Sequence, residues 1–149
     1  MTIQELSEKF QEICLNHKEV KAFYVGNTWD QAASKSSDAY PCVWMEFPVL
    51  ITYDGKFKTY AFALDILALA KSDDVWNELK MQSQCEQIAD QLMQVFKLKI
   101  AYVNFTSAGG LTVKNLNADI ACGVRIDMQV ATGRECEPLN NFKEEMNRL

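Results

Sequence analysis

The chain has 149 residues, of which 48% are hydrophobic, with only three prolines and six glycines. This length and composition predict one ordered globular domain and exclude a disordered or repetitive chain. Twenty acidic against fifteen basic residues give a formal charge of −5, which disfavours sequence-blind binding to nucleic acid, because such binding needs cations that replace phosphate counterions.

The cysteines are odd in number, widely spread and mostly surrounded by apolar residues. They are Cys14, Cys42, Cys85, Cys122 and Cys136. The N-terminal stretch MTIQELSEKF is charged and amphipathic, unlike the apolar core of a secretory signal. We therefore expect free, buried thiols in a reducing compartment. The longest apolar stretch, residues 60–70, contains Asp65 and is shorter than the roughly 20 residues that span a membrane, so we expect no membrane contact.

The first element is a predicted helix. Thr2 and Glu5 have the spacing of a capping box, and apolar residues then recur every three or four positions until the helix ends near Asn16 or Lys18. Residues 22–25 predict a short strand, and the polar stretch 26–40 predicts a long loop that contains Trp29. Trp29 could pack back on the core or contact a partner, and both alternatives stay open.

A β-hairpin is predicted next. Residues 42–47 and 49–53 predict strand segments interrupted by Pro48, so the chain should lie at a sheet edge or carry a bulge there. The dipeptide Asp54-Gly55 between β-forming residues predicts a tight turn.

The return strand of this hairpin should cover residues 56–69. Alternation places Tyr60, Phe62, Leu64 and Ile66 on one face and Asp65 on the other, more solvated or interfacial face. Ser72, Asp73 and Asp74 then predict the start of a long helix that reaches about Lys97, with a glutamine-rich polar face that includes Gln82.

Further strands are predicted over residues 100–105 and 119–132, and Gly109-Gly110 predicts a flexible turn between them. The order of elements predicts an α+β two-layer sandwich, in which a mainly antiparallel sheet is covered on one face by the N-terminal helix and the long helix. We expect one domain over residues 1–133, followed by a tail or interaction arm over 134–149. The predicted core comprises Tyr60, Phe62, Leu64, Ile66, Leu79, Ile88, Leu92, Val95, Val124, Ile126 and Met128.

Catalytic chemistry finds little support in the sequence. The sole histidine, His17, is expected at the exposed end of the first helix, and no cysteines or histidines cluster as zinc ligands do. No glycine loop has the residues that hold phosphate. A helix cap accounts for Asp73 and Asp74, and a solvated strand face accounts for Asp119 and Asp127. We therefore expect no enzyme, and no catalytic, cofactor-binding or metal-ligating residue.

Four segments together resemble a known family. They are YPCVWMEFP from Tyr40, TYAFALDILALAK, CEQIADQLMQVF and NADIACGVRIDMQVATGRECEP. They resemble small neck proteins of tailed phages, of the tail-terminator or tail-completion type found in crAss-like and other Bacteroidales phages. The resemblance covers about residues 1–138 and carries over no site residue.

This resemblance implies a structural virion protein that forms a six-fold or twelve-fold ring between portal and tail. Its partners would be copies of itself and portal, adaptor and tail proteins, with DNA only passing through the channel. The protein would be located in the virion neck or tail, and in the host cytoplasm during assembly. The alternative is a small cytoplasmic ligand-binding or regulatory α+β domain, with a pocket between helix and sheet.

Protein partners should contact segments that bury little apolar surface within their own domain. We place the interface on residues 26–40, on the hairpin tip and on the C-terminal arm. The candidate interface residues are Trp29, Asp54, Gly55, Arg134, Phe142, Met146 and Leu149.

Overall fold

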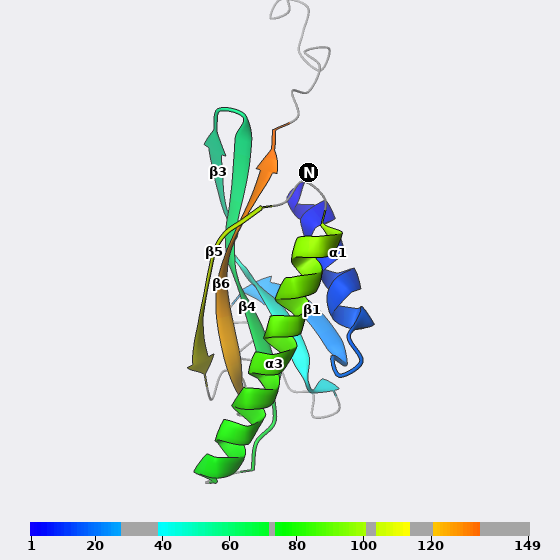
Figure 1. Cartoon of the computed structure of the whole chain (residues 1–149), viewed down its shortest axis with the longest axis vertical. Coiled ribbons are helices and arrows are strands. Elements are labelled where there is room, and N and C mark those ends of the chain that lie inside the picture. The colour runs from blue at the N-terminus through cyan, green and yellow to red at the C-terminus, as the bar shows by residue number, and fades with distance from the viewer. Residues whose placement is uncertain (28–38, 72–73, 101–103, 114–120, 135–149) are drawn as a thin grey trace, which may run out of the picture.

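The computed structural model describes residues 1–27, 39–71, 74–100, 104–113 and 121–134. They form two helices on one face of a six-stranded sheet (Figure 1). The elements are α1 (Ile3–Asn16), β1 (Ala22–Asn27), β2 (Cys42–Phe47), β3 (Leu50–Asp54), β4 (Phe57–Ala68), α3 (Val75–Lys99), β5 (Asn104–Val113) and β6 (Cys122–Gly133). The predicted α+β class, with its mainly antiparallel sheet, is confirmed.

The sheet has the strand order β1-β2-β4-β6-β5, and β3 pairs with β4 beyond the end of β2. All pairs are antiparallel except β1 with β2. The parallel pair is possible because a longer connection separates the two strands, whereas a tight turn joins only antiparallel neighbours. The β1 strand also takes in Gly26 and Asn27, which the sequence had assigned to the loop.

Local signals in the sequence explain both helices. The Thr2 backbone N–H donates to Glu5 Oε2 at 2.7 Å and the Glu5 backbone N–H donates to Thr2 Oγ1 at 3.2 Å, which is the predicted capping box. At the start of α3, the Asp74 side chain accepts a hydrogen bond from the Asn77 backbone N–H at 3.0 Å. Both helices therefore begin where the sequence predicts.

The main core lies between the two helices and the sheet. The Phe10 ring of α1 lies 4.2 Å from the Phe96 ring of α3 and 5.4 Å from the Phe62 ring of β4, between ring centroids. The predicted strand residues Tyr60, Phe62, Leu64, Ile66, Val124, Ile126 and Met128 are all buried in this core, as are Ile88 and Leu92.

The core prediction is wrong for two residues, which are exposed in the structure. Leu79 is 46% exposed and Val95 is 38% exposed. Leu79 belongs to the first turns of α3, which reach past the sheet in Figure 1 and have less to pack against. Val95 lies on the side of α3 that faces α1 across a groove.

Three further expectations are corrected. Asp65 is completely buried, and Arg125 donates a hydrogen bond to its carboxylate that offsets part of the cost of burial. Gln82 of the predicted polar helix face is also buried, and its amide donates to the Val113 carbonyl at 3.2 Å. Gly109 and Gly110 form no turn: they lie inside β5, opposite residues of β6. In each case a partner distant in sequence overrides the local pattern.

The chain changes strand at Pro48, as predicted. Met45 lies opposite Leu64, and Leu50 lies opposite Ala61. More residues therefore separate the two positions along β2 and β3 than along β4, so the strand pairing is irregular at this point. The β2 strand itself lies inside the sheet, between β1 and β4. Of the two alternatives predicted at Pro48, an edge strand is therefore wrong for β2, and an irregularity of the bulge kind is found.

A smaller apolar cluster lies on the sheet face opposite the helices. It contains Tyr40, Cys42, Trp44, Leu67 and Ala121, and the Trp44 ring lies 4.9 Å from the Tyr24 ring. Tyr40, which the sequence placed at the end of the exposed loop, is therefore a packed residue.

Candidate functional site

The β3–β4 hairpin carries large apolar side chains that the domain does not cover. Every residue of β3 is exposed, and the hairpin extends past the N-terminal end of α1 (Figure 1). Because β3 extends beyond α1 and α3 and continues the β2 side of the sheet, neither of these two described helices packs on it. We define the hairpin surface as the exposed residues Phe47, Leu50, Ile51, Tyr53 and Phe57.

The predicted interface residues Asp54, Gly55 and Arg134 meet at the tip of this hairpin. Asp54 pairs with Phe57 across the turn, and Gly55 has a φ of 47°, a conformation that glycine adopts readily. The Arg134 backbone N–H donates to the Lys56 carbonyl at 2.7 Å. Its guanidinium donates to the Gly55 carbonyl at 3.2 Å and lies 5.2 Å from the centroid of the Tyr53 ring.

The other predicted interface residues are Trp29, Phe142, Met146 and Leu149, and all four lie outside the described residues. The structure thus joins the hairpin tip to the first residue of the predicted arm and leaves the remaining part of that prediction untested.

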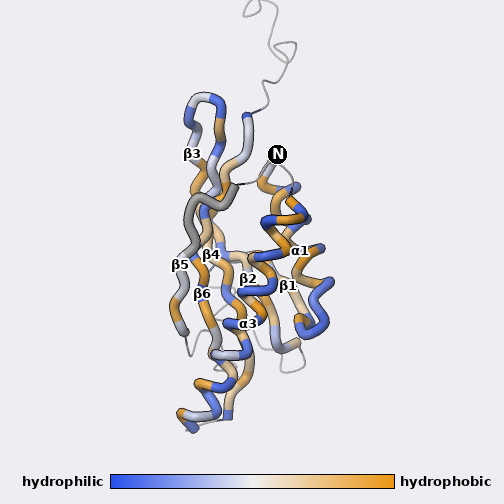
Figure 2. Tube along the Cα trace, viewed as in Figure 1, coloured by the Kyte–Doolittle hydropathy of each residue, from blue (hydrophilic) through white to orange (hydrophobic). Residues whose placement is uncertain are grey.

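A second exposed apolar surface lies at the start of α3. We define the helix-end surface as Val75, Trp76 and Leu79, of which Trp76 is 81% exposed. The first turns of α3 extend below the sheet in Figure 1, at the end of the molecule opposite the hairpin. Figure 2 shows apolar positions both on the hairpin and at this end of α3.

Sequence reasoning missed most of these apolar residues. An alternating pattern of apolar and polar residues indicates which face of a strand is buried, but only when the strand has one buried face. The available signal is the run Leu50, Ile51 and Tyr53, which puts apolar residues on both faces of a short strand. Trp76 directly after a helix cap is a comparable signal, since the first turn of a surface helix is usually polar.

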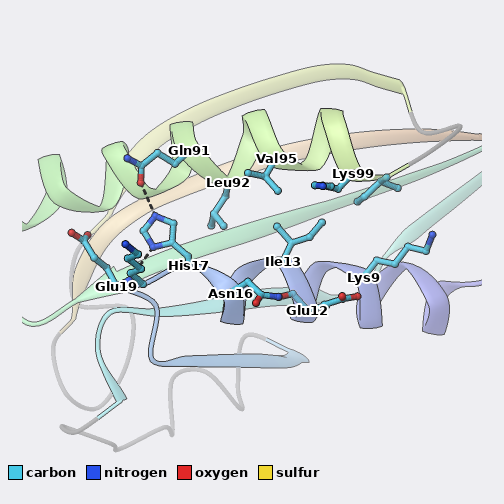
Figure 3. A pocket seen from close by; sticks show the side chains of 12 residues that line it. Lys9, Glu12, Ile13, Asn16, His17, Glu19, Gln91, Leu92, Val95 and Lys99 are labelled. Carbon is cyan, nitrogen blue, oxygen red and sulfur yellow. Dashed lines mark hydrogen bonds between the residues drawn. The ribbon is translucent and has the colours of Figure 1, made fainter.

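A groove of about 780 Å³ runs between α1 and α3 (Figure 3). Ile13, Leu92 and Val95 provide apolar walls, and Lys9 and Lys99 lie toward one end. At the other end the side chain of His17 meets that of Gln91. A smaller pocket of about 410 Å³ lies between α3 and the strands β5 and β6, where the alternative function expects one, and the groove between the two helices is larger.

His17 is held on both sides of its ring. The Glu19 backbone N–H donates to His17 Nδ1 at 3.1 Å, so Nε2 carries the proton of the neutral ring and donates to Gln91 Oε1, 2.6 Å away. Neither ring nitrogen is left to accept a proton from a nucleophile while these hydrogen bonds persist. The geometry gives His17 the role of joining the end of α1 to α3.

Three charged side chains form a network on the sheet face opposite the helices. Arg125 Nε donates to Asp65 Oδ1 at 2.9 Å, and Arg125 Nη2 donates to Glu46 Oε1 at 2.5 Å. The residues come from the neighbouring strands β6, β4 and β2. Burial and the adjacent Asp65 raise the pKa of Glu46 to about 7, although Arg125 acts in the opposite direction.

The described thiols are buried. Burial raises the pKa of Cys14 and of Cys85 to about 12, so both are protonated at neutral pH and are poor nucleophiles. Across the described ranges, no three histidine, cysteine or acidic side chains are grouped so that they could hold a metal ion.

Comparison of the chain with known protein families and with curated proteins found no match. Neither helix of the described structure is both long and apolar enough to cross a membrane.

Proposed function

We propose that this chain is a structural subunit that assembles head to tail with copies of itself into a ring, as a neck, tail-terminator or connector protein between the portal and tail of a tailed phage. The observation that carries the proposal is the presence of two unlike apolar surfaces, the hairpin surface and the helix-end surface, at opposite ends of the molecule.

Two unlike surfaces favour a particular kind of assembly. When one patch of a subunit binds a different patch of the next, the contact repeats and closes into a ring if the rotation between subunits allows. Clustered large apolar side chains at a surface commonly mark such contacts. Tyr53 and Trp76 are the expected anchors, because tyrosine and tryptophan are enriched among the residues that dominate interface energies.

The place in the virion comes from the resemblance to phage neck proteins, which implies a six-fold or twelve-fold ring around the DNA channel. The formal charge of −5 supports this proposal. The net negative charge of the subunit repels DNA, which suits a channel through which DNA passes without being held.

The test is the size and shape of the purified full-length chain in solution. Size-exclusion chromatography with light scattering should give a mass of several subunits, and negative-stain electron microscopy should show closed rings with a central opening. A chain that stays monomeric or dimeric at every concentration up to the millimolar range would contradict the proposal.

The groove between α1 and α3 favours the second candidate function, a small ligand-binding domain. Its volume of about 780 Å³ lies within the range of roughly 300–1,000 Å³ that is usual for small-molecule sites. This candidate predicts a monomer or dimer whose thermal stability rises when a small amphipathic ligand is added. The same light-scattering measurement therefore separates the two candidates.

A further inference from the structure

The apolar and charged side chains that line the groove between α1 and α3 determine which occupant can bind there. Ile13 of α1 and Val95 of α3 both point into it, and Leu92 lies deeper between them (Figure 3). Val95 remains 38% exposed, so its apolar surface is available to another side chain. An occupant that fills the groove must supply apolar side chains along one face.

The charges at the groove add a second requirement. Three lysines line it, Lys9, Lys18 and Lys99, together with two carboxylates, Glu12 and Glu19. The two lysines at one end, Lys9 and Lys99, come from different helices and lie on either side of the opening in Figure 3. Carboxylates of an occupant that lies between them would meet positive charge on both sides.

The C-terminal segment of this chain has these properties. Phe142, Met146 and Leu149 are spaced by four and three residues, as on one face of a helix. On such a helix Glu145 flanks the apolar face and can reach the lysines, whereas Glu144 lies on the opposite side. The segment also contains Lys143 and Arg148, whose charges match the groove carboxylates Glu12 and Glu19.

The direction of β6 indicates which copy supplies the segment. Its last residue, Gly133, lies opposite Phe57 in the hairpin, and Arg134 is fixed to Lys56 by a backbone hydrogen bond. In Figure 1 this end of β6 lies above the N-terminus of α1 and points away from both helices. The last described residues of β6 therefore point away from the groove of their own copy.

We infer that residues 139–149 of one copy dock in the groove between α1 and α3 of a neighbouring copy, with their apolar face on Ile13 and Val95 and with Glu145 near Lys9 and Lys99. This inference rests on the proposed self-assembly for the presence of the neighbour. A closed assembly repeats the contact at every subunit, so a contact that is weak alone still adds to its stability.

The test uses the full-length chain and a zero-length carbodiimide cross-linker, which joins a carboxylate to an amine only where the two touch. Unlabelled protein and protein labelled with heavy nitrogen are mixed before assembly, cross-linked and digested for mass spectrometry. We expect Glu145 joined to Lys9 or Lys99 in peptide pairs of mixed isotope, which arise only between two copies.

Two variants of α3 provide the matched comparison. Val95→Asp puts a carboxylate into the apolar wall and should lower the yield of these cross-links about tenfold or more, because a charge is costly to bury against apolar side chains. Leu98→Asp alters a residue that is 81% exposed, on the same helix but outside the groove, and should leave the yield unchanged. Circular dichroism checks that both variants stay folded.

The inference is overturned if wild-type protein gives no cross-link between the segment and the groove, if Val95→Asp leaves the yield unchanged, or if every such cross-link joins peptides of one isotope. The experiment distinguishes a failure of the docking inference from a failure of the proposed function. Rings without these cross-links would refute the docking alone, whereas mixed-isotope cross-links in particles that are not rings would refute the ring alone.

Discussion

Arg125 lies between two carboxylates, and one of them, Asp65, is completely buried. A buried charge is costly unless a partner of opposite charge and good geometry compensates it. Glu46 keeps 14% of its side chain exposed and has a pKa raised to about 7, so it can take up a proton near neutral pH. Loss of Arg125 should therefore cost more free energy at Asp65 than at Glu46.

Arg125→Met should lower the free energy of unfolding by about 3–5 kcal/mol, because the substitution leaves the buried Asp65 without its cation. Glu46→Gln should change it by less than about 1.5 kcal/mol, since the amide oxygen still accepts the hydrogen bond from Arg125. Urea unfolding followed by circular dichroism measures both values. Equal losses for the two variants would show that the network does not distinguish the carboxylates.

The raised pKa of Glu46 also predicts how stability depends on pH. The folded chain binds the Glu46 proton up to about pH 7, whereas the unfolded chain releases it near pH 4.5, the ordinary pKa of a glutamate. The stabilisation is therefore complete below pH 4.5 and is lost as the pH rises toward 7. The stability of wild type relative to Glu46→Gln should fall across this window and level off above it, as measured by urea unfolding at several pH values. A difference that grows with pH would contradict the assignment.

Among the secondary-structure elements, the close approach of β6 to β4 depends on a glycine. A Cβ atom at Gly123 would lie 1.8 Å from the Ile66 carbonyl oxygen, which is far inside a van der Waals contact. The long central pair of strands, residues 57–68 with residues 122–133, therefore admits no side chain at this position without a shift of the backbone.

Gly123→Ala should destabilise the domain by at least about 1–3 kcal/mol, the usual cost of forcing extra atoms into a packed interior. Gly109→Ala in β5 is the matched control, because a Cβ there meets nothing within 4 Å. That substitution should be neutral or slightly stabilising, by up to about 1 kcal/mol. Thermal unfolding of the two variants tests the contrast, and similar melting temperatures would refute it.

The elements that the sequence predicted well are those with local signals. The capping box of Thr2 and Glu5, the Asp54-Gly55 turn and the cap at Asp74 each involve residues within a few positions of one another. Gly109-Gly110 was read wrongly because its place in a strand depends on pairing with β6, which no local pattern reports.

The remaining errors of the sequence-based prediction concern residues whose burial depends on how far a neighbouring element extends. Helical spacing correctly aligned Leu79 and Val95 with the buried residues of α3, but spacing does not report how far the sheet extends or that α1 leaves a groove. Burial of Asp65 depends on Arg125, which is 60 positions away. The hairpin tip was predicted as an interface because it buries little apolar surface within its own domain, whereas the apolar residues on its strands were missed.

For the whole molecule, the two exposed surfaces are expected to act as a complementary pair. The hairpin surface adjoins the cations Lys56 and Arg134 and the carboxylate of Asp54, and the helix-end surface adjoins the carboxylates of Asp74 and Glu78. Lys71 and Lys80 also lie near the start of α3 and reduce this complementarity. We therefore expect apolar contact to supply most of the affinity and charge to influence the orientation.

The most direct measurement mixes two variants that each lose one surface. Tyr53→Asp damages the hairpin surface and Trp76→Asp damages the helix-end surface, so neither variant alone can form the proposed contact. Leu98→Asp is the control, because Leu98 is as exposed as Trp76, at 81%, but belongs to neither surface.

Light scattering at low micromolar concentration, where the docked C-terminal segment alone is expected to be too weak to join copies, should show each variant as a monomer and the control as the full assembly. An equimolar mixture of the two variants should form a dimer with one copy of each, since one intact surface of each kind remains available. A full assembly formed by either variant alone, or a mixture that stays monomeric, would contradict head-to-tail assembly through these two surfaces.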